Sequence, residues 1–162
     1  MLLDRLQNLP EPKKTYLEIL QVHDKEVPIA NLLAFFFRNK ENHELGDLFI
    51  KALLQTKYYE LDVENNPTSS GTLISQIGSI EEQTNILNSI SNVKVKTEVK
   101  TSKDKDDNKR IDILIDTAKF IICIEFKINH KLNNPLETYR KHITKSYIDF
   151  DKKIFYIILT PN

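Results

Sequence analysis

FIICIEFKI, residues 120–128, is an apolar run that ends in two charged side chains. Its first five residues have the composition of a β-strand buried on both faces. Glu125 and Lys127 then follow on either side of Phe126. Because side chains alternate along a strand, this carboxylate and this ammonium are expected to share one face. A carboxylate and an ammonium at the end of a central strand need an explanation beyond surface solvation.

The flanking sequence predicts a mixed sheet around this strand. Residues 93–99 alternate Val and Thr with Lys and Glu, which is typical of a half-buried strand. Residues 110–116, RIDILID, alternate again, and residues 153–160, KIFYIILT, form a last apolar strand. The second and third strands are joined too tightly for anything but an antiparallel hairpin, whereas a helix links the third to the fourth, so these two are expected to be parallel.

Helical patterns precede the strands. Residues 12–56 are expected to be helical, and PIANLLAFFFRN, residues 28–39, is so rich in apolar residues that this helix is expected to be central. ELGDLFIKALL, residues 44–54, has the spacing of an amphipathic helix. Its inner face is expected to carry Leu45, Leu48, Phe49, Ala52 and Leu53. Residues 61–78, rich in Asn, Ser and Gly, are expected to be a loop.

Two further helices have recognisable starts. Ser79, with Glu82 three residues on, resembles a capping box that would open a helix to about Ile90. Asn134 and Pro135 have the pattern of an N-cap and a first helical residue. The inner face of that last helix is expected to carry Leu136, Tyr139, Ile143 and Tyr147. The resulting fold class is α/β, with a mixed central sheet flanked by helices.

Composition limits the class of protein. The 162 residues, 40% hydrophobic, suit one domain over 1–162, with a helical extension over 1–60 and a core over 79–160. The abrupt end after a buried type of strand suggests a fragment of a longer chain, with a natural terminus as the alternative. The only cysteine, Cys123, excludes an internal disulfide and is compatible with a reducing cytoplasm. No signal peptide and no apolar stretch near the roughly 18 residues of a transmembrane helix is present, so we expect a soluble, cytoplasmic protein without membrane contact.

The net charge is zero but unevenly distributed. Residues 1–93 carry 8 Lys/Arg and 13 Asp/Glu, whereas residues 94–162 carry 15 Lys/Arg and 10 Asp/Glu. The neutral total argues against a generic DNA-coating protein. The basic C-terminal half could attract a polyanion, although ordinary solvated lysines would explain it equally well.

Asp112 is brought to the charged strand end by the predicted hairpin. A link of Thr117 and Ala118 would pair Asp112 with Cys123, and a slightly different register would pair it with Glu125. In both registers Asp112 lies on the face that Glu125 occupies. Cβ atoms of opposed residues are about 4.5–5.5 Å apart, so the two carboxylates would require a shared proton or a bound cation.

Asp, Glu and Lys on one face of adjacent strands can form a phosphodiester-cleaving site. Carboxylate oxygens suit Mg²⁺ or Mn²⁺, which can generate hydroxide and neutralise charge on phosphorus. Lys127 could hold the attacking water or stabilise the developing charge. The alternative is a structural ion pair between Glu125 and Lys127, which would be a poor stabiliser in a central strand because burying it costs solvation.

Asp112, followed thirteen residues later by Glu125, Phe126 and Lys127, resembles the PD-(D/E)XK nuclease superfamily. The chain is further similar to a family of uncharacterised bacterial PD-(D/E)XK proteins with HGLGDLFL, RIDILI and IENKI motifs. The corresponding stretches here are HELGDLFI at 43–50, RIDILI at 110–115 and IEFKI at 124–128. The resemblance implies a restriction-endonuclease-like αβββαβ core, with Asp112 and Glu125 as metal ligands and Lys127 as catalytic lysine.

The resemblance also implies accessory groups. Many superfamily members add an acid from a helix before the sheet, and Glu26 and Glu44 are both candidates. Glu98 is another, unless it is a solvent-facing strand residue. A related Gln-x-x-x-Tyr pattern keeps Tyr139, as an accessory or a core residue, but this chain has Pro135 where the pattern has Gln.

These features indicate a metal-dependent nuclease that uses Mg²⁺ or Mn²⁺ and acts on nucleic acid, with DNA as the expected partner and a homodimer left open. One alternative is a non-catalytic module that keeps the nuclease fold and binds nucleic acid or protein. A third is a phosphoesterase acting on small nucleotides, against which stands the lack of a glycine-rich phosphate cradle among three glycines.

Overall fold

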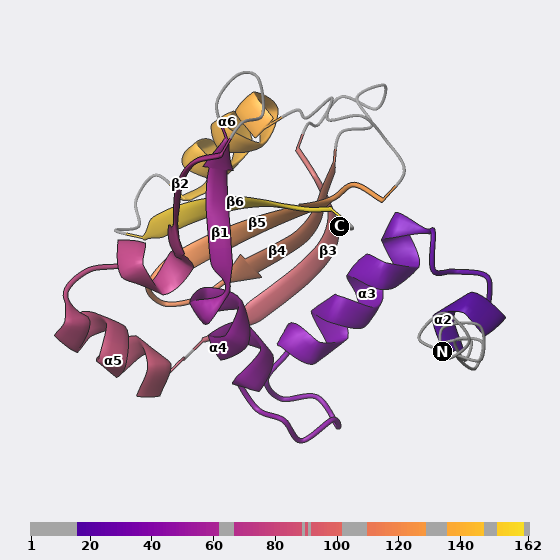
Figure 1. The fold of residues 1–162 in the computed structure, drawn as a ribbon, viewed down its shortest axis with the longest axis horizontal. Helices are drawn as coiled ribbons and strands as arrows, with labels where there is room; N and C mark the ends of the chain where they lie inside the picture. The colour runs from indigo at the N-terminus through magenta and orange to yellow at the C-terminus, as the bar shows by residue number, and fades with distance from the viewer. Residues whose placement is uncertain are drawn as a thin grey trace, which may run out of the picture.

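The structure is a computed structural model that describes residues 16–61, 67–88, 90, 92–101, 110–128, 136–147 and 152–160 (Figure 1). In chain order its elements are α2 (Tyr16–Ile19), α3 (Glu26–Phe37), α4 (Leu48–Gln55), β1 (Lys57–Leu61), β2 (Pro67–Thr72), the 3₁₀ turn η1 (Leu73–Gln76), α5 (Ile80–Asn88), β3 (Lys94–Lys100), β4 (Arg110–Asp116), β5 (Phe120–Phe126), α6 (Leu136–Tyr147) and β6 (Lys153–Leu159).

The central sheet has four strands in the order β3-β4-β5-β6 (Figure 1). β3 pairs with β4 and β4 with β5 in antiparallel orientation, whereas β5 and β6 are parallel. Every residue of β5 is buried. The predicted mixed sheet, its strand directions and the central place of β5 are therefore confirmed.

The β4–β5 register is the second of the two considered from the sequence. The ladder pairs Ile113 with Ile124, Leu114 with Cys123, Ile115 with Ile122 and Asp116 with Ile121. Continued by one step, this register sets Asp112 opposite Glu125. The Thr117 N–H donates to the Phe120 carbonyl at 3.0 Å. The two turn residues are therefore 118 and 119, one position later than predicted.

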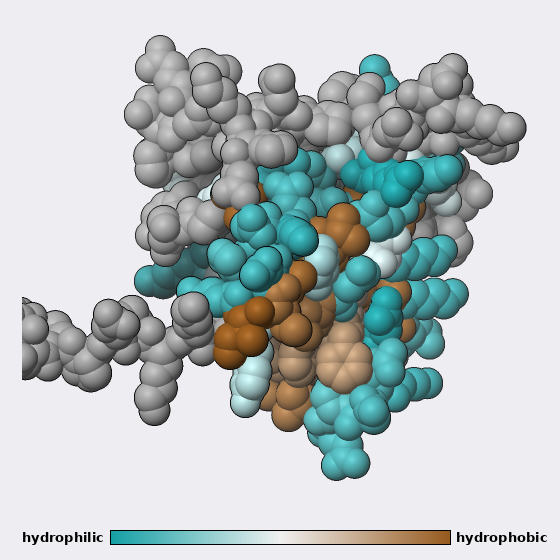
Figure 2. All heavy atoms as spheres, turned by 90° about the vertical axis from the view of Figure 1, so that its right-hand side faces the viewer, coloured by the Kyte–Doolittle hydropathy of each residue, from teal (hydrophilic) through white to brown (hydrophobic). Residues whose placement is uncertain are grey.

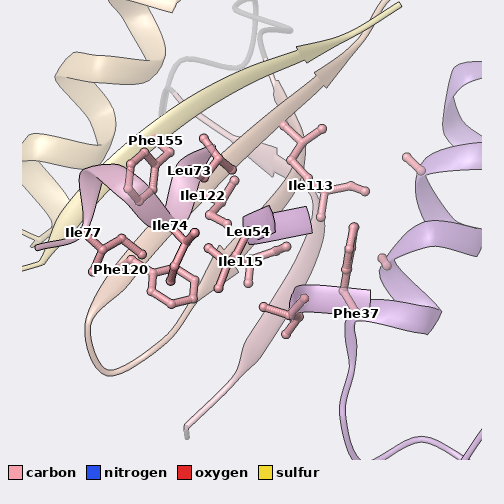
Figure 3. Packing of buried hydrophobic residues seen from close by; sticks show 14 of the residues in the cluster. Phe37, Leu54, Leu73, Ile74, Ile77, Ile113, Ile115, Phe120, Ile122 and Phe155 are labelled. Carbon is pink, nitrogen blue, oxygen red and sulfur yellow. The ribbon is translucent and has the colours of Figure 1, made fainter. Parts of the chain in front are cut away.

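Apolar side chains cover both faces of the sheet. On one face, residues of α3, α4 and η1 pack against alternate residues of β4 and β5 (Figure 3). On the other face, Tyr139 and Ile143 of α6 pack against Ile121 and Cys123 of β5. Burying an isoleucine contributes about 1.5–3 kcal/mol, so these layers hold β5 firmly in place. The predicted inner positions Tyr139 and Ile143 are confirmed, whereas Asn134 and Pro135 lie outside the described residues.

α3 is less central than its composition suggested. Ala30, Ala34 and Phe37 are buried on the side that packs against β3 and β4. Val27 and Leu32 remain 46% and 41% exposed. The face on which α3 lies carries a band of apolar atoms bordered by hydrophilic ones (Figure 2). The prediction of a central helix is thus wrong for its outer side, because the sheet covers only one side of it.

α4 begins later than expected, and the residues that it buries differ from those predicted for its inner face. Ile50 and Leu54 are its buried residues, whereas Leu45 and Leu48, predicted to face inward, are exposed. The helix begins only at Leu48, after Gly46 with a φ of +56°, a backbone conformation that favours glycine. The helical prediction over 12–56 therefore fails at residues 20–25 and 38–47, which lie between the helices, and residues 12–15 lie outside the described residues.

The loop predicted over residues 61–78 is wrong for residues 67–76, which form regular structure, whereas residues 62–66 lie outside the described residues. β1 and β2 pair as an antiparallel hairpin, and η1 follows directly. Gly71 of β2 lies opposite Tyr58 of β1, and the Tyr58 ring occupies the space beside it. The Ser- and Gly-rich composition of β2 resembles that of a loop.

The start of α5 follows the predicted capping box. The Ser79 N–H donates to Glu82 Oε2 at 2.8 Å, and the Glu82 N–H donates to Ser79 Oγ at 3.3 Å. Hydrogen bonding of the Glu82 carboxylate to the main chain and the side chain of Ser79 lowers the pKa of Glu82. Among the helices of the described ranges, none is long and apolar enough to cross a membrane.

Candidate functional site

The candidate site lies where β4 and β5 separate. Their paired residues end at Ile113 and Ile124. Beyond this point the Phe126 N–H, which a continued ladder would direct to the β4 backbone, donates instead to Asp112 Oδ2 at 2.7 Å. On the other side of β5, the Lys127 N–H donates to the Leu159 carbonyl at 2.9 Å, so pairing with β6 continues. Asp112 is thus fixed by the main chain of β5.

Glu26 binds the next free donor along the same edge of β5. The Ile128 N–H donates to Glu26 Oε1 at 3.1 Å. Phe126 ends β5 and Ile128 follows two residues later, so the two bonded N–H groups lie at most about 7 Å from each other. Carboxylates from β4 and from the first residue of α3 therefore replace a neighbouring strand at the end of β5.

The structure separates the two helical candidates for an accessory acid. Glu26 begins α3 and lies beside Lys127. Glu44 is exposed and follows the other end of α3, a helix about 18 Å long. His43, its neighbour, accepts the Leu45 N–H at Nδ1 and lies 3.0 Å from the Arg38 carbonyl at Nε2. Only Glu26 of these two acids is thus brought to the strand end.

Both carboxylate oxygens of Glu125 have a donor. Lys127 Nζ donates to Glu125 Oε1 at 2.6 Å. The Tyr139 hydroxyl lies 2.9 Å from Glu125 Oε2 and 2.6 Å from the Arg110 carbonyl, and it shares its one hydrogen between these acceptors. Glu125 is 6% exposed. Tyr139, left open as accessory or core by the sequence, is a buried residue that also orients Glu125.

The electrostatics reflect an excess of negative charge. Burial, opposed by the Phe126 hydrogen bond and reinforced by the charge of Glu125, raises the pKa of Asp112 to about 6. Burial acts to lower the pKa of Lys127, but the hydrogen bond and charge of Glu125, with Glu26 and Asp112, raise it overall. Burial and Glu125 likewise raise the pKa of Tyr139. Among the described residues, three carboxylates therefore surround one ammonium, and a cation would relieve their repulsion.

Glu98 lies near Asp112 but binds another residue. In the β3–β4 register, residues 97 and 99 pair with 113 and 111, so Glu98 stands at the position opposite Asp112. Its φ of +53° is uncommon for a residue other than glycine and interrupts the ladder. Arg110 Nη1 donates to Glu98 Oε2 at 3.1 Å. Its charge helps to raise the pKa of Asp112, while its carboxylate faces Arg110.

The residues at this strand end suit a divalent cation. Asp112 and Glu125 offer carboxylate oxygens, the donors that Mg²⁺ and Mn²⁺ prefer. Within the described ranges, no group of three or more His, Cys, Asp or Glu side chains forms a ready-made metal cage. Two carboxylates completed by water are the usual protein coordination of Mg²⁺.

Sequence reasoning missed the main-chain part of this site. The Phe126 and Ile128 N–H groups and the Arg110 carbonyl each bind one of its side chains. Main-chain groups carry no residue signature. The break in pairing between β4 and β5, which frees them, depends on tertiary packing.

Comparison with known proteins identifies the family to which the chain belongs. No curated protein and no solved structure matches the chain. A family model described as the PD-(D/E)XK nuclease superfamily matches residues 15–162. Nucleases of this superfamily generally use divalent metal ions, which agrees with the carboxylates at the end of β5. With this match over nearly its whole length and a mixed sheet flanked by helices, the chain belongs to the PD-(D/E)XK nuclease superfamily.

Proposed function

We propose that the protein is a metal-dependent nuclease that hydrolyses phosphodiester bonds in DNA. The observation that carries the proposal is the unbalanced charge at the end of β5. There, Asp112, Glu125 and Glu26 lie around the ammonium of Lys127, and Asp112 has a raised pKa of about 6. Such a cluster is held at a cost in free energy, which a cation and a phosphate together would offset.

Asp112 and Glu125 are the proposed ligands of Mg²⁺ or Mn²⁺. A bound ion of this kind would supply an acidified water and neutralise charge on the phosphate. Asp112 is held by the Phe126 N–H through Oδ2 alone. Within the described part of the chain, its Oδ1 has no hydrogen bond and is open to a ligand.

Lys127 is the proposed catalytic lysine. Its ammonium is bonded to Glu125 Oε1 in the structure. On arrival of substrate, it would leave this oxygen and donate to the attacking water or to a phosphate oxygen. Its position two residues from Glu125 on one strand lets the same side chain reach both partners.

Two further residues have proposed supporting roles. Tyr139 holds Glu125 Oε2 and so fixes the orientation of that carboxylate. Glu26, anchored on the Ile128 N–H, is the proposed accessory acid next to Lys127. Both are positioning residues in this proposal.

DNA is proposed as the substrate for reasons of charge. The half of the chain that carries the site has 15 Lys/Arg against 10 Asp/Glu, which favours a polyanion over a small nucleotide. Cys123 is free and buried, which is compatible with the proposed cytoplasmic location. A homodimer stays a prediction.

The test is cleavage of labelled linear and circular DNA with Mg²⁺, with Mn²⁺ and with EDTA. The wild type is expected to cut only with metal, and Asp112→Asn is expected to be inactive. Asp116→Asn is the matched control, because it changes the same residue type on the same strand at the opposite end. Cutting of the circle would identify an endonuclease. DNA binding without cutting under all metal conditions would contradict the proposal and favour a non-catalytic module.

A further inference from the structure

Two cations face each other at the end of the β3–β4 ladder. Lys100 and Arg110 are its last pair and lie directly opposite one another. Both side chains are exposed. Directly opposed residues of an antiparallel pair have Cβ atoms about 4.5–5.5 Å apart, and like charges at this separation destabilise the pairing. The pair therefore destabilises the β3–β4 hairpin unless an anion lies between the two cations.

Glu98 provides the only carboxylate that the described ranges place in contact with this pair. Arg110 Nη1 donates to Glu98 Oε2 at 3.1 Å. Glu98 reaches Arg110 diagonally across the ladder, from a residue with a φ of +53°. One carboxylate thus partly neutralises two cations. A phosphate with its own negative charge could replace it at Arg110 and would contact Lys100 as well.

The pair lies at the same end of the sheet as the candidate site. β4 runs antiparallel to β5, so the start of β4 is next to the end of β5. Arg110 is two residues before Asp112, or about 7 Å along the strand. The Arg110 carbonyl also contacts Tyr139, which holds Glu125. Since one DNA strand rises about 3.4 Å along the helix axis per nucleotide, this separation lies within one or two nucleotide steps.

We propose that Lys100 and Arg110 form a phosphate-binding subsite for the nucleic-acid strand, next to the cleavage position. The proposal rests on the proposed nuclease function and adds how its substrate is held. In the free protein the Glu98 carboxylate accepts a hydrogen bond from Arg110. The phosphate displaces this carboxylate when it binds. The subsite contacts the backbone only, so it contributes affinity and alignment without reading the base sequence.

The test is DNA binding by the full chain in EDTA, which prevents metal-dependent cutting. Fluorescence anisotropy with a labelled 20-nucleotide duplex is measured at KCl concentrations from about 50 to 300 mM. Lys100→Ala and Arg110→Ala are each expected to weaken binding about three- to tenfold and to reduce the slope of log affinity against log salt by about 0.9. Glu98→Gln is expected to tighten binding by a similar factor, because it releases Arg110.

Lys96→Ala is the matched control, since Lys96 is an exposed lysine of the same strand that faces Leu114. It is expected to leave affinity and slope within twofold of the wild type. Lys100→Ala and Arg110→Ala values within twofold of this control would overturn the subsite. So would unchanged or weaker binding by Glu98→Gln, since a purely structural Arg110–Glu98 pair predicts no gain. If the wild type binds and cuts DNA but Lys100→Ala and Arg110→Ala bind like the control, only the proposed subsite is contradicted. If the wild type binds no DNA, both the subsite and the nuclease function are contradicted.

Discussion

The β4–β5 hairpin has a short lysine–carboxylate contact at each end. At the turn end, Lys152 Nζ lies 2.6 Å from Asp116 Oδ1, with side chains 14% and 17% exposed. At the open end, Lys127 Nζ lies 2.6 Å from Glu125 Oε1, with side chains 13% and 7% exposed. Distance and burial therefore do not distinguish the two ends.

The surroundings do distinguish them. At the turn end the strands stay paired up to Asp116. At the open end the ladder has stopped, and Asp112 and Glu26 add two carboxylates next to Lys127. The comparison teaches that a buried ion pair is weak evidence for a site. Unbalanced charge beside unpaired main-chain groups is stronger evidence.

The largest difference between the two ends is expected in catalysis. Lys127→Ala removes the ammonium that is bonded to Glu125 and is expected to reduce the rate of DNA cleavage by about 10²–10³-fold. The reason is that no other described side chain can donate to the phosphate or to the water at that position. Single-turnover cleavage with saturating protein measures this rate without a contribution from binding.

Lys152→Ala is the control for this substitution. It breaks an ion pair of equal length and similar burial, so it is expected to lower stability while the cleavage rate stays within about twofold at temperatures where the protein is folded. Equal losses of cleavage rate in Lys127→Ala and Lys152→Ala would mean that the Lys127–Glu125 ion pair has only a structural role.

A smaller difference is expected in the stability of the metal-free protein. Removing the carboxylate charge is expected to raise stability at the open end and to lower it at the turn end. The pKa of Asp112 is raised by burial to about 6 from an unfolded value near 3.8, so the folded state binds this proton more tightly. Stability is therefore lost as pH rises from about 4 through 6. Asp112→Asn, whose side-chain oxygen can still accept the Phe126 N–H, is expected to be more stable than the wild type at pH 7.5 by on the order of 1 kcal/mol, after allowance for solvent screening.

Urea unfolding in EDTA at pH 4 and at pH 7.5 checks the sign. The gain from Asp112→Asn should be large at pH 7.5 and much smaller at pH 4, where Asp112 is protonated in the folded state and partly protonated in the unfolded state. Asp116→Asn should instead lower stability at pH 7.5, because it weakens the contact with Lys152. A loss of stability in Asp112→Asn at pH 7.5 would show that the ionised Asp112 carboxylate does not destabilise the folded state.

The smallest effect is expected for the residue that holds Glu125. Tyr139→Phe keeps the buried ring but removes the hydroxyl contacts to Glu125 and to the Arg110 carbonyl. It is expected to cost about 1 kcal/mol of unfolding free energy and to lower kcat about three- to tenfold, with KM nearly unchanged. A changed KM with an unchanged kcat would mean that Tyr139 acts on substrate binding rather than through Glu125.

The sheet and the meeting of its charged residues could be predicted from local pattern. The apolar composition of β5 and the alternation in β3 and β4 identify strands, and the short link after Asp116 permits only a hairpin. The two-residue period then places Asp112 and Glu125 on one face. These steps need no information about packing.

Other features depend on tertiary contacts that local pattern does not encode. Apart from Glu26 and Asn31, α3 consists of apolar residues, so its sequence could not show that Val27 would stay exposed. The choice of Glu26 over Glu44 follows from which end of α3 meets β5. The left-handed backbone of Glu98, which lets it contact Arg110, has no signature in a strand of alternating residues.

Titration of Mn²⁺ into the metal-free protein by calorimetry tests the central claim most directly. The claim is that the open end of the hairpin, and not the turn end, attracts a cation. Wild type and Asp116→Asn are predicted to bind Mn²⁺ with equal affinity, and Asp112→Asn at least tenfold more weakly. Equal binding by Asp112→Asn and the wild type, or no binding by the wild type, would contradict the account.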